Sequence, residues 1–448
     1  MTYEWLRAEA EAGRIEEVIV SVPDLQGRLQ GSRLSVPYFL DEAARQGFGA
    51  CVYLLATDVE MDTGPGYAID AWNTGFGDFV LRPDPATVRP LPWDPGTALV
   101  IADAMWPAGQ PVEVAPRRVL RTQLDRLAER GLAAYAGTEL EFLIFRDSYE
   151  DAWERRYHGL RTGTRYNVDY SLQGLAGIEP VVRRVRREMV RAGLTMETAR
   201  AECHAGQYEI VFRYDEAMAT CDKHVFFKNG AKEIAAQEGV ALTFMPKFDE
   251  GEGNSCHIHL SLRGIDDSLA FAGDDDDGMS ELMRHFVAGQ LACLPDLALL
   301  MAPNVNSYKR LQPGAFAPTG ITWGRDNRTC PIRVVGAGAS LRIEHRVPGG
   351  DANPYLAVAA VLAAGLHGIE NRLPLPAPHA ANALADPAVP RLPTTLAEAL
   401  HRWETSEIAA KAFGDAVLGH YAQAARAELA AFETAVTDWE RVRGFERM

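Results

Sequence analysis

The sequence is poor in cysteine, in long apolar runs and in positive charge. Its six cysteines include no Cys-x-x-Cys pair, which excludes a disulfide framework and a zinc ribbon and fits a reducing compartment. The longest run of small apolar residues, 355–366, is too short to cross a bilayer and predicts a buried helix. Lysine and arginine number 45 against 61 aspartates and glutamates, so the net charge of −16 argues against nucleic-acid or membrane partners.

The beginning of the sequence is acidic and has no apolar segment of the kind that a signal peptide needs. We therefore expect a cytoplasmic protein. Hydrophobic residues make up 47% and charged residues 24%, which is ordinary for a globular protein and excludes wholesale disorder.

The pattern of apolar residues predicts an α+β fold in two domains. Residues 1–106 form a separate α+β unit, and the proline-rich stretch that follows begins a second domain, 107–448. An amphipathic helix is expected at 117–130. Later strands cluster around 133–145, 206–213, 241–262 and 332–347, and two helices, 396–413 and 421–443, end the chain.

Four short segments alternate apolar side chains on one face with polar or charged ones on the other. Residues two apart in a strand share a face, so each segment predicts a strand with an apolar back and a polar front. Taken alone, the pair Glu139 and Glu141 also fits an exposed edge, and the pair His257 and His259 also fits a solvated face. The polar fronts are Glu139 and Glu141; Gln207 and Glu209; His257, His259 and Ser261; and Arg342, Glu344 and Arg346.

With Glu202, which precedes a glycine turn, these segments offer five carboxylates and one imidazole. Such a set can pack together only if cations neutralise it. Ligands dominated by oxygen favour magnesium or manganese over zinc, and their number suits two or three ions. The candidate metal ligands are Glu139, Glu141, Glu202, Glu209, His257 and Glu344.

Arginines are dense in the same part of the chain, in otherwise Gly-, Asn- and Pro-rich sequence. Arginine matches carboxylate and phosphate oxygens two at a time, and carboxylates for metal with arginines for anions are typical of nucleotide-dependent phosphoryl transfer. The chain has no Walker loop, no GxGxxG opening a helix and no GxSxG elbow. The arginines are Arg310, Arg325, Arg328, Arg333, Arg342 and Arg346.

Seven motifs in order and spacing resemble the glutamine synthetase family over essentially the whole chain. The resemblance implies a β-grasp-like N-terminal domain and a catalytic domain whose curved antiparallel sheet forms part of a barrel. It also implies a dodecamer of two hexameric rings with active sites between neighbouring subunits. The motifs are DFVLRPD (78–84), GTELEF (137–142), ECHAGQYE (202–209), NSCHIHLS (254–261), NSYKRLQPG (306–314), DNRTCPIR (326–333) and RIEHRVPGGDANPY (342–355).

The resemblance also implies roles for single residues. The expected reaction phosphorylates the γ-carboxylate of L-glutamate with ATP, after which an amine displaces phosphate. Glu141, Glu202 and Glu209 are expected to hold one magnesium, and Glu139, His257 and Glu344 a second. Expected nucleotide contacts are Glu197, His259 and Ser261; phosphate contacts are Arg328, which also acts in catalysis, and Arg333; glutamate contacts are Gly253, Arg310 and Arg346.

Two departures from the family bear on the amine. The glutamate of the flap motif is replaced by Phe316, and the aspartate-serine motif of the ammonium pocket is missing. An apolar Phe316 suits the carbon chain of an organic amine, so a glutamate–amine ligase using ethanolamine or a polyamine is the favoured prediction. Asp62 or Glu60 is the expected base, because a primary amine arrives protonated at neutral pH.

Alternatives remain open at this stage. Phe316 also fits simple packing in a glutamine synthetase that uses ammonia, and a catalytically silent oligomer of the family would show many of the same motifs. The segment 379–395, which carries an adenylylated tyrosine in some bacterial glutamine synthetases, has no tyrosine here. We therefore expect no such regulation.

Overall fold

Two β-sheets divide the strands of the chain. The computed structural model describes residues 1–313 and 315–447; Gly314, which ends the motif at 306–314, and Met448, which ends the predicted second domain, lie outside the described residues. The smaller sheet has the order β2-β1-β6-β4-β3, with β5 paired to β6. The larger sheet has the order β13-β14-β15-β12-β7-β9-β8, with β10 and β11 paired to β7.

The smaller sheet is built from the first 105 residues. Its central pair, β1 and β6, is parallel and every other pair is antiparallel, which fits the predicted β-grasp-like arrangement. The elements of this part are α1 (Tyr3–Glu11), β1 (Ile15–Pro23), β2 (Leu29–Ser35), α2 (Val36–Tyr38), α3 (Ala44–Gln46), β3 (Phe48–Cys51), α4 (Ala71–Thr74), β4 (Asp78–Pro83), β5 (Arg89–Pro90) and β6 (Gly96–Met105).

The larger sheet and most helices follow. The strands are β7 (Leu132–Phe145), β8 (Met196–Ala201), β9 (Gln207–Phe212), β10 (Asp215–Glu216), β11 (Ala241–Thr243), β12 (Cys256–Gly264), β13 (Trp323–Arg325), β14 (Ile332–Val335) and β15 (Arg342–His345). The helices are α5 (Pro116–Ala128), α6 (Tyr149–Glu154), α7 (Glu179–Arg191), α8 (Ala217–Gln237), α9 (Glu281–Leu297), α10 (Val305–Arg310), α11 (Pro354–Glu370), α12 (Leu396–Thr405), α13 (Glu407–Phe413), α14 (Asp415–Thr434) and α15 (Asp438–Gly444).

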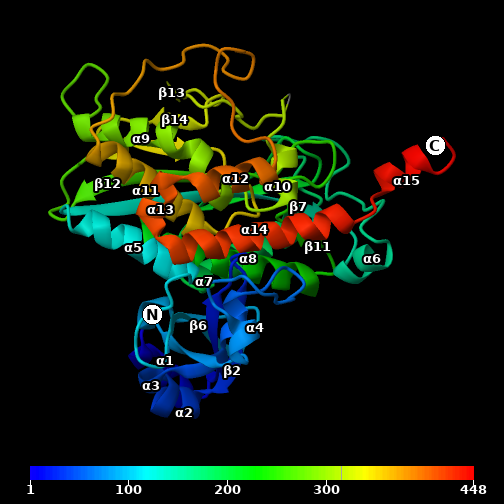
Figure 1. The fold of residues 1–448 in the computed structure, drawn as a ribbon. Coiled ribbons are helices and arrows are strands. Elements are labelled where there is room, and N and C mark those ends of the chain that lie inside the picture. The colour runs from blue at the N-terminus through cyan, green and yellow to red at the C-terminus, as the bar shows by residue number, and fades with distance from the viewer. Residues whose placement is uncertain (314, 448) are drawn as a thin grey trace.

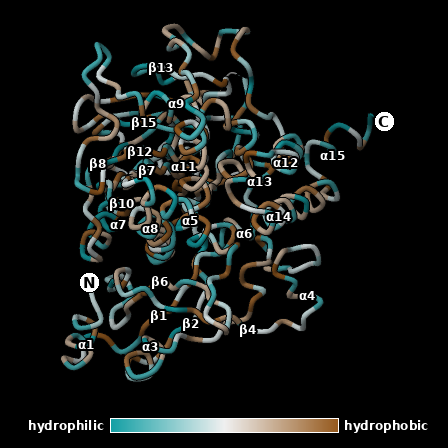
Figure 2. Tube along the Cα trace, turned by 60° about the vertical axis from the view of Figure 1, so that its left-hand side comes forward, coloured by the Kyte–Doolittle hydropathy of each residue, from teal (hydrophilic) through white to brown (hydrophobic). Residues whose placement is uncertain are grey.

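The mixed α and β fold class is confirmed. Figures 1 and 2 both place β2 and β6 below the body that carries β7, β12 and the helices α5, α8 and α11, and Figure 2 shows β1 beside them. No strand is common to the two sheets among the described residues. We propose on this basis that 1–106 and 107–448 are the two domains of the chain.

Helix α11 is the predicted buried helix. Asn353 caps it by accepting a hydrogen bond from the Tyr355 amide, and Pro354 occupies its first turn, where a missing N–H costs nothing. Most of its residues are buried on every side. Across residues 1–313 and 315–447, no helix has both the length and the apolar character that a membrane span requires.

The end of the chain differs from the prediction of two helices, because it contains four. Ser406 ends α12 and caps α13 by accepting a hydrogen bond from the Ala409 amide. Gly414, with φ of 80°, separates α13 from α14, since few other residues adopt that conformation easily. Thr437 then caps α15, which projects from the body in Figure 1. The apolar pattern continues across these breaks, so it predicts fewer helices than the structure contains.

A buried arginine connects the smaller sheet to helices of the rest of the chain. Arg117, in the first turn of α5, donates to Asp84 Oδ2 at 2.8 Å and to Asp103 Oδ1 at 2.5 Å, both from the first domain. It also donates to both carboxylate oxygens of Asp222 on α8, each at 3.0 Å, and Tyr355 holds Asp222 through its hydroxyl. The guanidinium therefore fixes α5 and α8 against the smaller sheet.

The four segments with polar fronts lie side by side as β15, β12, β7 and β9. Pairing sets Glu139 opposite His257 and Glu141 opposite Glu209, while His259 lies opposite Glu344. Because each strand alternates, this register brings the polar fronts onto one face. The prediction that these are strands is confirmed, and none of the four lies at an edge of the sheet.

Candidate active site

A cavity of about 280 Å³, here called the carboxylate pocket, lies over these polar fronts. Three groups of potential metal-ligand atoms lie at this pocket, each with its atoms within 4.8 Å of one another, and one of them is Asp169, Glu202 and Cys203. The other two contain only predicted ligands. The first trio is Glu141, Glu202 and Glu209; the second trio is Glu139, His257 and Glu344. These are the two sets that the resemblance implied as separate magnesium sites, and the structure brings each set together.

The first trio gathers like charges away from water. Burial, followed by repulsion from Glu141, raises the pKa of Glu202 to about 7, although Arg200 opposes the shift. Burial and the nearby carboxylates, Glu139 foremost, also raise the pKa of Glu209. Two buried carboxyls with raised pKa values favour a cation between them, because a cation lets both ionise.

Arg200 and backbone groups hold the first trio in place. The Arg200 guanidinium donates to Glu202 at 2.9 Å and lies 2.5 Å from Glu209 Oε1. Glu141 Oε2 accepts from the Ser255 amide at 2.7 Å and from the Gln207 side chain at 3.2 Å. Arg200 is not among the residues predicted from the sequence, because its contact with Glu209 depends on the pairing of β8 with β9.

The second trio combines two carboxylates with one imidazole. Burial lowers the pKa of His257, with Arg346 acting in the same direction, so the ring is neutral and has a lone pair to donate. Burial would raise the pKa of Glu139, but hydrogen bonds from His257 and His259 outweigh it and lower the pKa. Glu344 is fully buried, and His257 and Arg346 outweigh that burial, so its pKa is about 2.

Carboxylates with one neutral imidazole are a donor set suited to magnesium or manganese. The buried, mutually repelling carboxyls of the first trio support the same conclusion. Both trios therefore fit divalent ions, which would neutralise phosphate charge in this pocket.

Arginines line the other side of the carboxylate pocket. Arg310 and Arg346 are buried, and Arg310 donates to the Val347 carbonyl oxygen at 2.8 Å. Arg328 also lines the pocket. Arg333 does not, but it reaches the second trio by donating to Glu344 Oε2 at 2.6 Å. All four arginines named in the sequence analysis as phosphate or glutamate contacts thus lie at or directly behind the pocket.

Gly253 lies where no side chain fits. A Cβ there would approach the Pro246 carbonyl oxygen to 2.1 Å and Arg310 Cγ to 3.0 Å. Its own carbonyl accepts a hydrogen bond from Gln207 at 3.0 Å. The loop backbone can therefore line the pocket directly beside Arg310.

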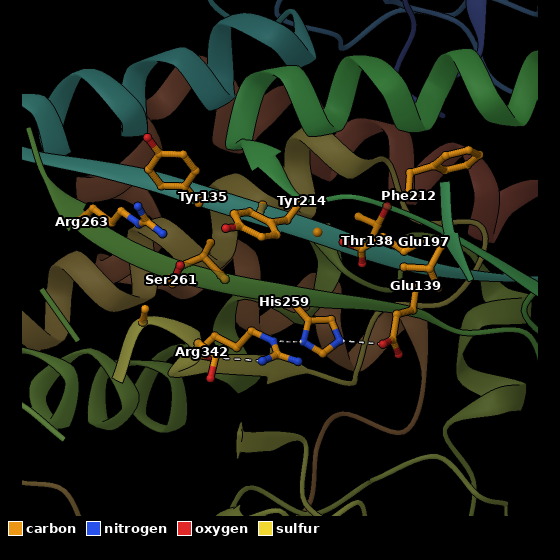
Figure 3. A pocket seen from close by; sticks show the side chains of 16 residues that line it. Tyr135, Thr138, Glu139, Glu197, Phe212, Tyr214, His259, Ser261, Arg263 and Arg342 are labelled. Carbon is orange, nitrogen blue, oxygen red and sulfur yellow. Dashed lines mark hydrogen bonds and ion pairs between the residues drawn. The ribbon is translucent and has the colours of Figure 1, made fainter. Parts of the chain in front are cut away.

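A second cavity, of about 430 Å³ and here called the aromatic pocket, adjoins the first (Figure 3). Glu197, His259 and Ser261, the predicted nucleotide contacts, all line it. In Figure 3 the rings of Tyr135, Tyr214 and Phe212 lie above the strand that carries His259 and Ser261. Stacking surfaces beside hydroxyl and charged groups suit a planar, polar base.

His259 connects Arg342 to Glu139. The Arg342 side chain donates to His259 Nδ1 at 3.0 Å, so the proton of a neutral ring is on Nε2, which lies 2.9 Å from Glu139 Oε1. Glu139 lines both pockets. The two cavities therefore meet at this carboxylate.

The two predicted base residues lie apart from these pockets. The amides of Glu60 and Asp62 both donate to Asp58 Oδ1, at 3.0 and 2.9 Å, in a turn of the first domain. Neither side chain lines the carboxylate pocket of its own chain. Their role as bases stays a prediction that requires a neighbouring subunit.

Comparison with known proteins agrees with this geometry. Residues 113–443 match the family model described as glutamine synthetase, catalytic domain. The chain is 58% identical over 446 residues to gamma-glutamylethanolamide synthetase of Streptomyces coelicolor, covering 99% of this chain and 96% of that protein. It is 34% identical over 438 residues to glutamate–isopropylamine ligase of a Pseudomonas species, covering 97% and 95%.

A solved structure of a GmaS/ADP complex has the same fold. It superposes with a TM-score of 0.86 at 30% sequence identity and covers 98% of this chain and 99% of that one. The match of the family model to most of the chain, and of these relatives to nearly all of it, leads to one conclusion. The chain belongs to the glutamine synthetase family.

Proposed function

We propose that this protein is an ATP-dependent ligase that joins the γ-carboxylate of L-glutamate to a small organic amine. The observation that carries the proposal is the convergence of two metal-ligand trios with Arg310 and Arg346 in one pocket, beside an aromatic pocket that shares Glu139. Relatives that act on ethanolamine and isopropylamine support an organic amine. Ethanolamine is the favoured substrate, with polyamines next.

The residues of the carboxylate pocket have separate roles in the proposed reaction. Arg310, Arg346 and the backbone at Gly253 hold glutamate with its γ-carboxylate toward the trios. Arg328 and Arg333 neutralise the transferring phosphoryl group as ATP forms γ-glutamyl phosphate. This activates the γ-carbonyl, because phosphate is a far better leaving group than oxide. An amine then attacks, and the amide, ADP and phosphate leave.

An amine panel tests this function. Purified protein with ATP, magnesium and glutamate receives ethanolamine, isopropylamine, putrescine or ammonium, and ADP and the γ-glutamylamide are measured. We expect amide formation with an organic amine to exceed that with ammonium by at least about tenfold in kcat/KM. Strong turnover with ammonium alone would instead identify a glutamine synthetase.

A variant in the first trio separates an enzyme from a silent oligomer. Glu141→Gln keeps the shape but removes one charge, and we expect it to lower kcat by at least about 100-fold because phosphoryl charge loses its counter-ion. Unchanged activity would remove the metal assignment.

A further inference from the structure

We propose that Glu252 forms the amine subsite, binding the protonated amine and accepting its proton. This inference rests on the proposed function and names the base that the reaction needs. It assigns that role to a residue of the same chain, in the loop between β11 and β12, instead of to Glu60 or Asp62.

Glu252 lies beside the flap residues at the wall of the carboxylate pocket. It lines the carboxylate pocket together with Ala315, Phe316 and Ala317. Its Oε2 accepts a hydrogen bond from the Phe316 amide at 3.2 Å, across 64 residues of chain. The carboxylate is therefore fixed against the segment in which a phenylalanine replaces the expected glutamate of the flap.

The other carboxylates of the pocket are already engaged. Those of the two trios contact histidines, arginines or one another. Asp169 lies 3.3 Å from the Cys203 thiol, which donates to it. Within residues 1–313 and 315–447, Glu252 accepts the Phe316 amide and forms no ion pair with lysine, arginine or histidine. Asp169 likewise forms no ion pair there, but its ligand atoms group with those of Glu202 and Cys203, whereas Glu252 belongs to no such group and contacts the flap. We therefore assign Glu252 to the cationic substrate.

The surroundings of Glu252 favour a cation with a carbon chain. Phe316 is 55% exposed, and the flap residues Ala315, Phe316 and Ala317 carry no charge. On its own loop the charged neighbours are Lys247, Asp249 and Glu250, and Lys247 donates to the Gly251 carbonyl oxygen. Of the pocket arginines, Arg200 pairs with Glu202 and Glu209, Arg346 pairs with Glu344, and Arg310 donates to the Val347 carbonyl oxygen; Arg328 is the proposed phosphate contact. An ammonium head can thus meet Glu252 while its carbon chain lies against the Phe316 ring.

The proposed step is balanced. The amine arrives as R–NH3⁺ and gives one proton to the Glu252 carboxylate, which frees its nitrogen lone pair. That lone pair forms the bond to the γ-carbonyl carbon of γ-glutamyl phosphate, and the bond from this carbon to the phosphate oxygen breaks. Phosphate leaves with the electron pair and takes the second nitrogen proton, while Glu252 returns its own proton to water.

Glu252→Gln tests the proposal, with Glu250→Gln as the matched control. The glutamine carbonyl can still accept the Phe316 amide, so the variant is expected to fold, which its melting temperature checks. Glu250 is exposed on the same loop and lies outside the pocket lining. We expect Glu252→Gln to lower kcat for amide formation at least about 100-fold and Glu250→Gln to leave it unchanged.

A second readout isolates the amine step. Without amine, γ-glutamyl phosphate closes on its own α-amino group to give 5-oxoproline, so ADP and 5-oxoproline report phosphoryl transfer alone. We expect Glu252→Gln to keep this reaction within about twofold and Glu252→Asp to restore part of the amide formation. The assignment would be overturned if Glu252→Gln lost both reactions equally or kept amide formation. It would also be overturned if only the double variant Glu60→Gln/Asp62→Asn showed the loss of amide formation. Failure of wild-type protein to form any amide would instead defeat the proposed function.

Discussion

The carboxylates of the first trio make metal binding depend on pH. In the folded chain Glu202 has a pKa of about 7, against 4.5 for an ordinary glutamate, and the pKa of Glu209 is raised as well. Between about pH 4.5 and pH 7 the folded state therefore holds protons that the unfolded state has lost. The contribution of Glu202 to stability is present below this window and falls as the pH rises through it, and the raised pKa of Glu209 acts in the same direction.

Magnesium should reverse that loss, because the ion replaces the protons. We expect the magnesium-induced rise in Tm to be larger at about pH 8 than at about pH 5.5, where protons compete with the ion. Differential scanning calorimetry with and without magnesium measures this. Glu202→Gln should reduce the difference between the two pH values, and a magnesium shift independent of pH would contradict the account.

At the scale of elements, Arg117 links the smaller sheet to the helices α5 and α8. Arg117→Met leaves Asp222 buried without its cation, and breaking a buried pair in this way costs about 3–5 kcal/mol of unfolding free energy. Arg118→Met is the control, because Arg118 is partly exposed, lies 3.6 Å from Asp125 and should change stability by less than about 0.5 kcal/mol. Urea unfolding followed by fluorescence measures both, and equal effects would show that the link is unimportant.

The elements that carry the site were largely predictable. Alternation in 137–145 and 254–262 predicts strands with a polar front, since a period of two is a local property of the chain. Two arguments predicted that β15, β12, β7 and β9 lie side by side. Their many carboxylates can pack together only around cations, and the family resemblance implies the same arrangement. Their register, which sets Glu139 opposite His257, came from the structure.

What could not be predicted depends on contacts between distant segments or on single residues. The hydrogen bond from Phe316 to Glu252 joins two loops, and no periodicity connects them. Arg200 lies on a short strand whose pairing with β9 decides its role. The breaks at Ser406 and Gly414 come from caps within a continuous apolar pattern.

At the scale of the whole molecule, the C-terminal end of the chain offers apolar surface. Trp439, Val442 and Phe445 on and after α15 are 67%, 70% and 88% exposed. Large apolar side chains gathered in this way mark contact with another protein chain, and the family resemblance implies a dodecamer. We propose that α15 contributes to the contacts between subunits.

Sedimentation velocity tests this proposal. We expect the wild-type protein to sediment at about twelve times the 49.1 kDa mass of one chain. The triple change W439S/V442S/F445S should shift the protein to smaller species, while serine at Ile265, which is 76% exposed and follows β12, should not. A triple variant of unchanged mass would show that α15 has no part in assembly.

The position of Glu139 at the wall common to both pockets has a thermodynamic consequence. Glu139 contacts His259 in the aromatic pocket and also belongs to the second trio. A shift of this carboxylate when nucleotide binds therefore changes the affinity for the metal ion, and the reverse also holds. Nucleotide and metal should therefore bind with a coupling free energy that is the same whichever binds first. Order of addition would then be a matter of kinetics alone.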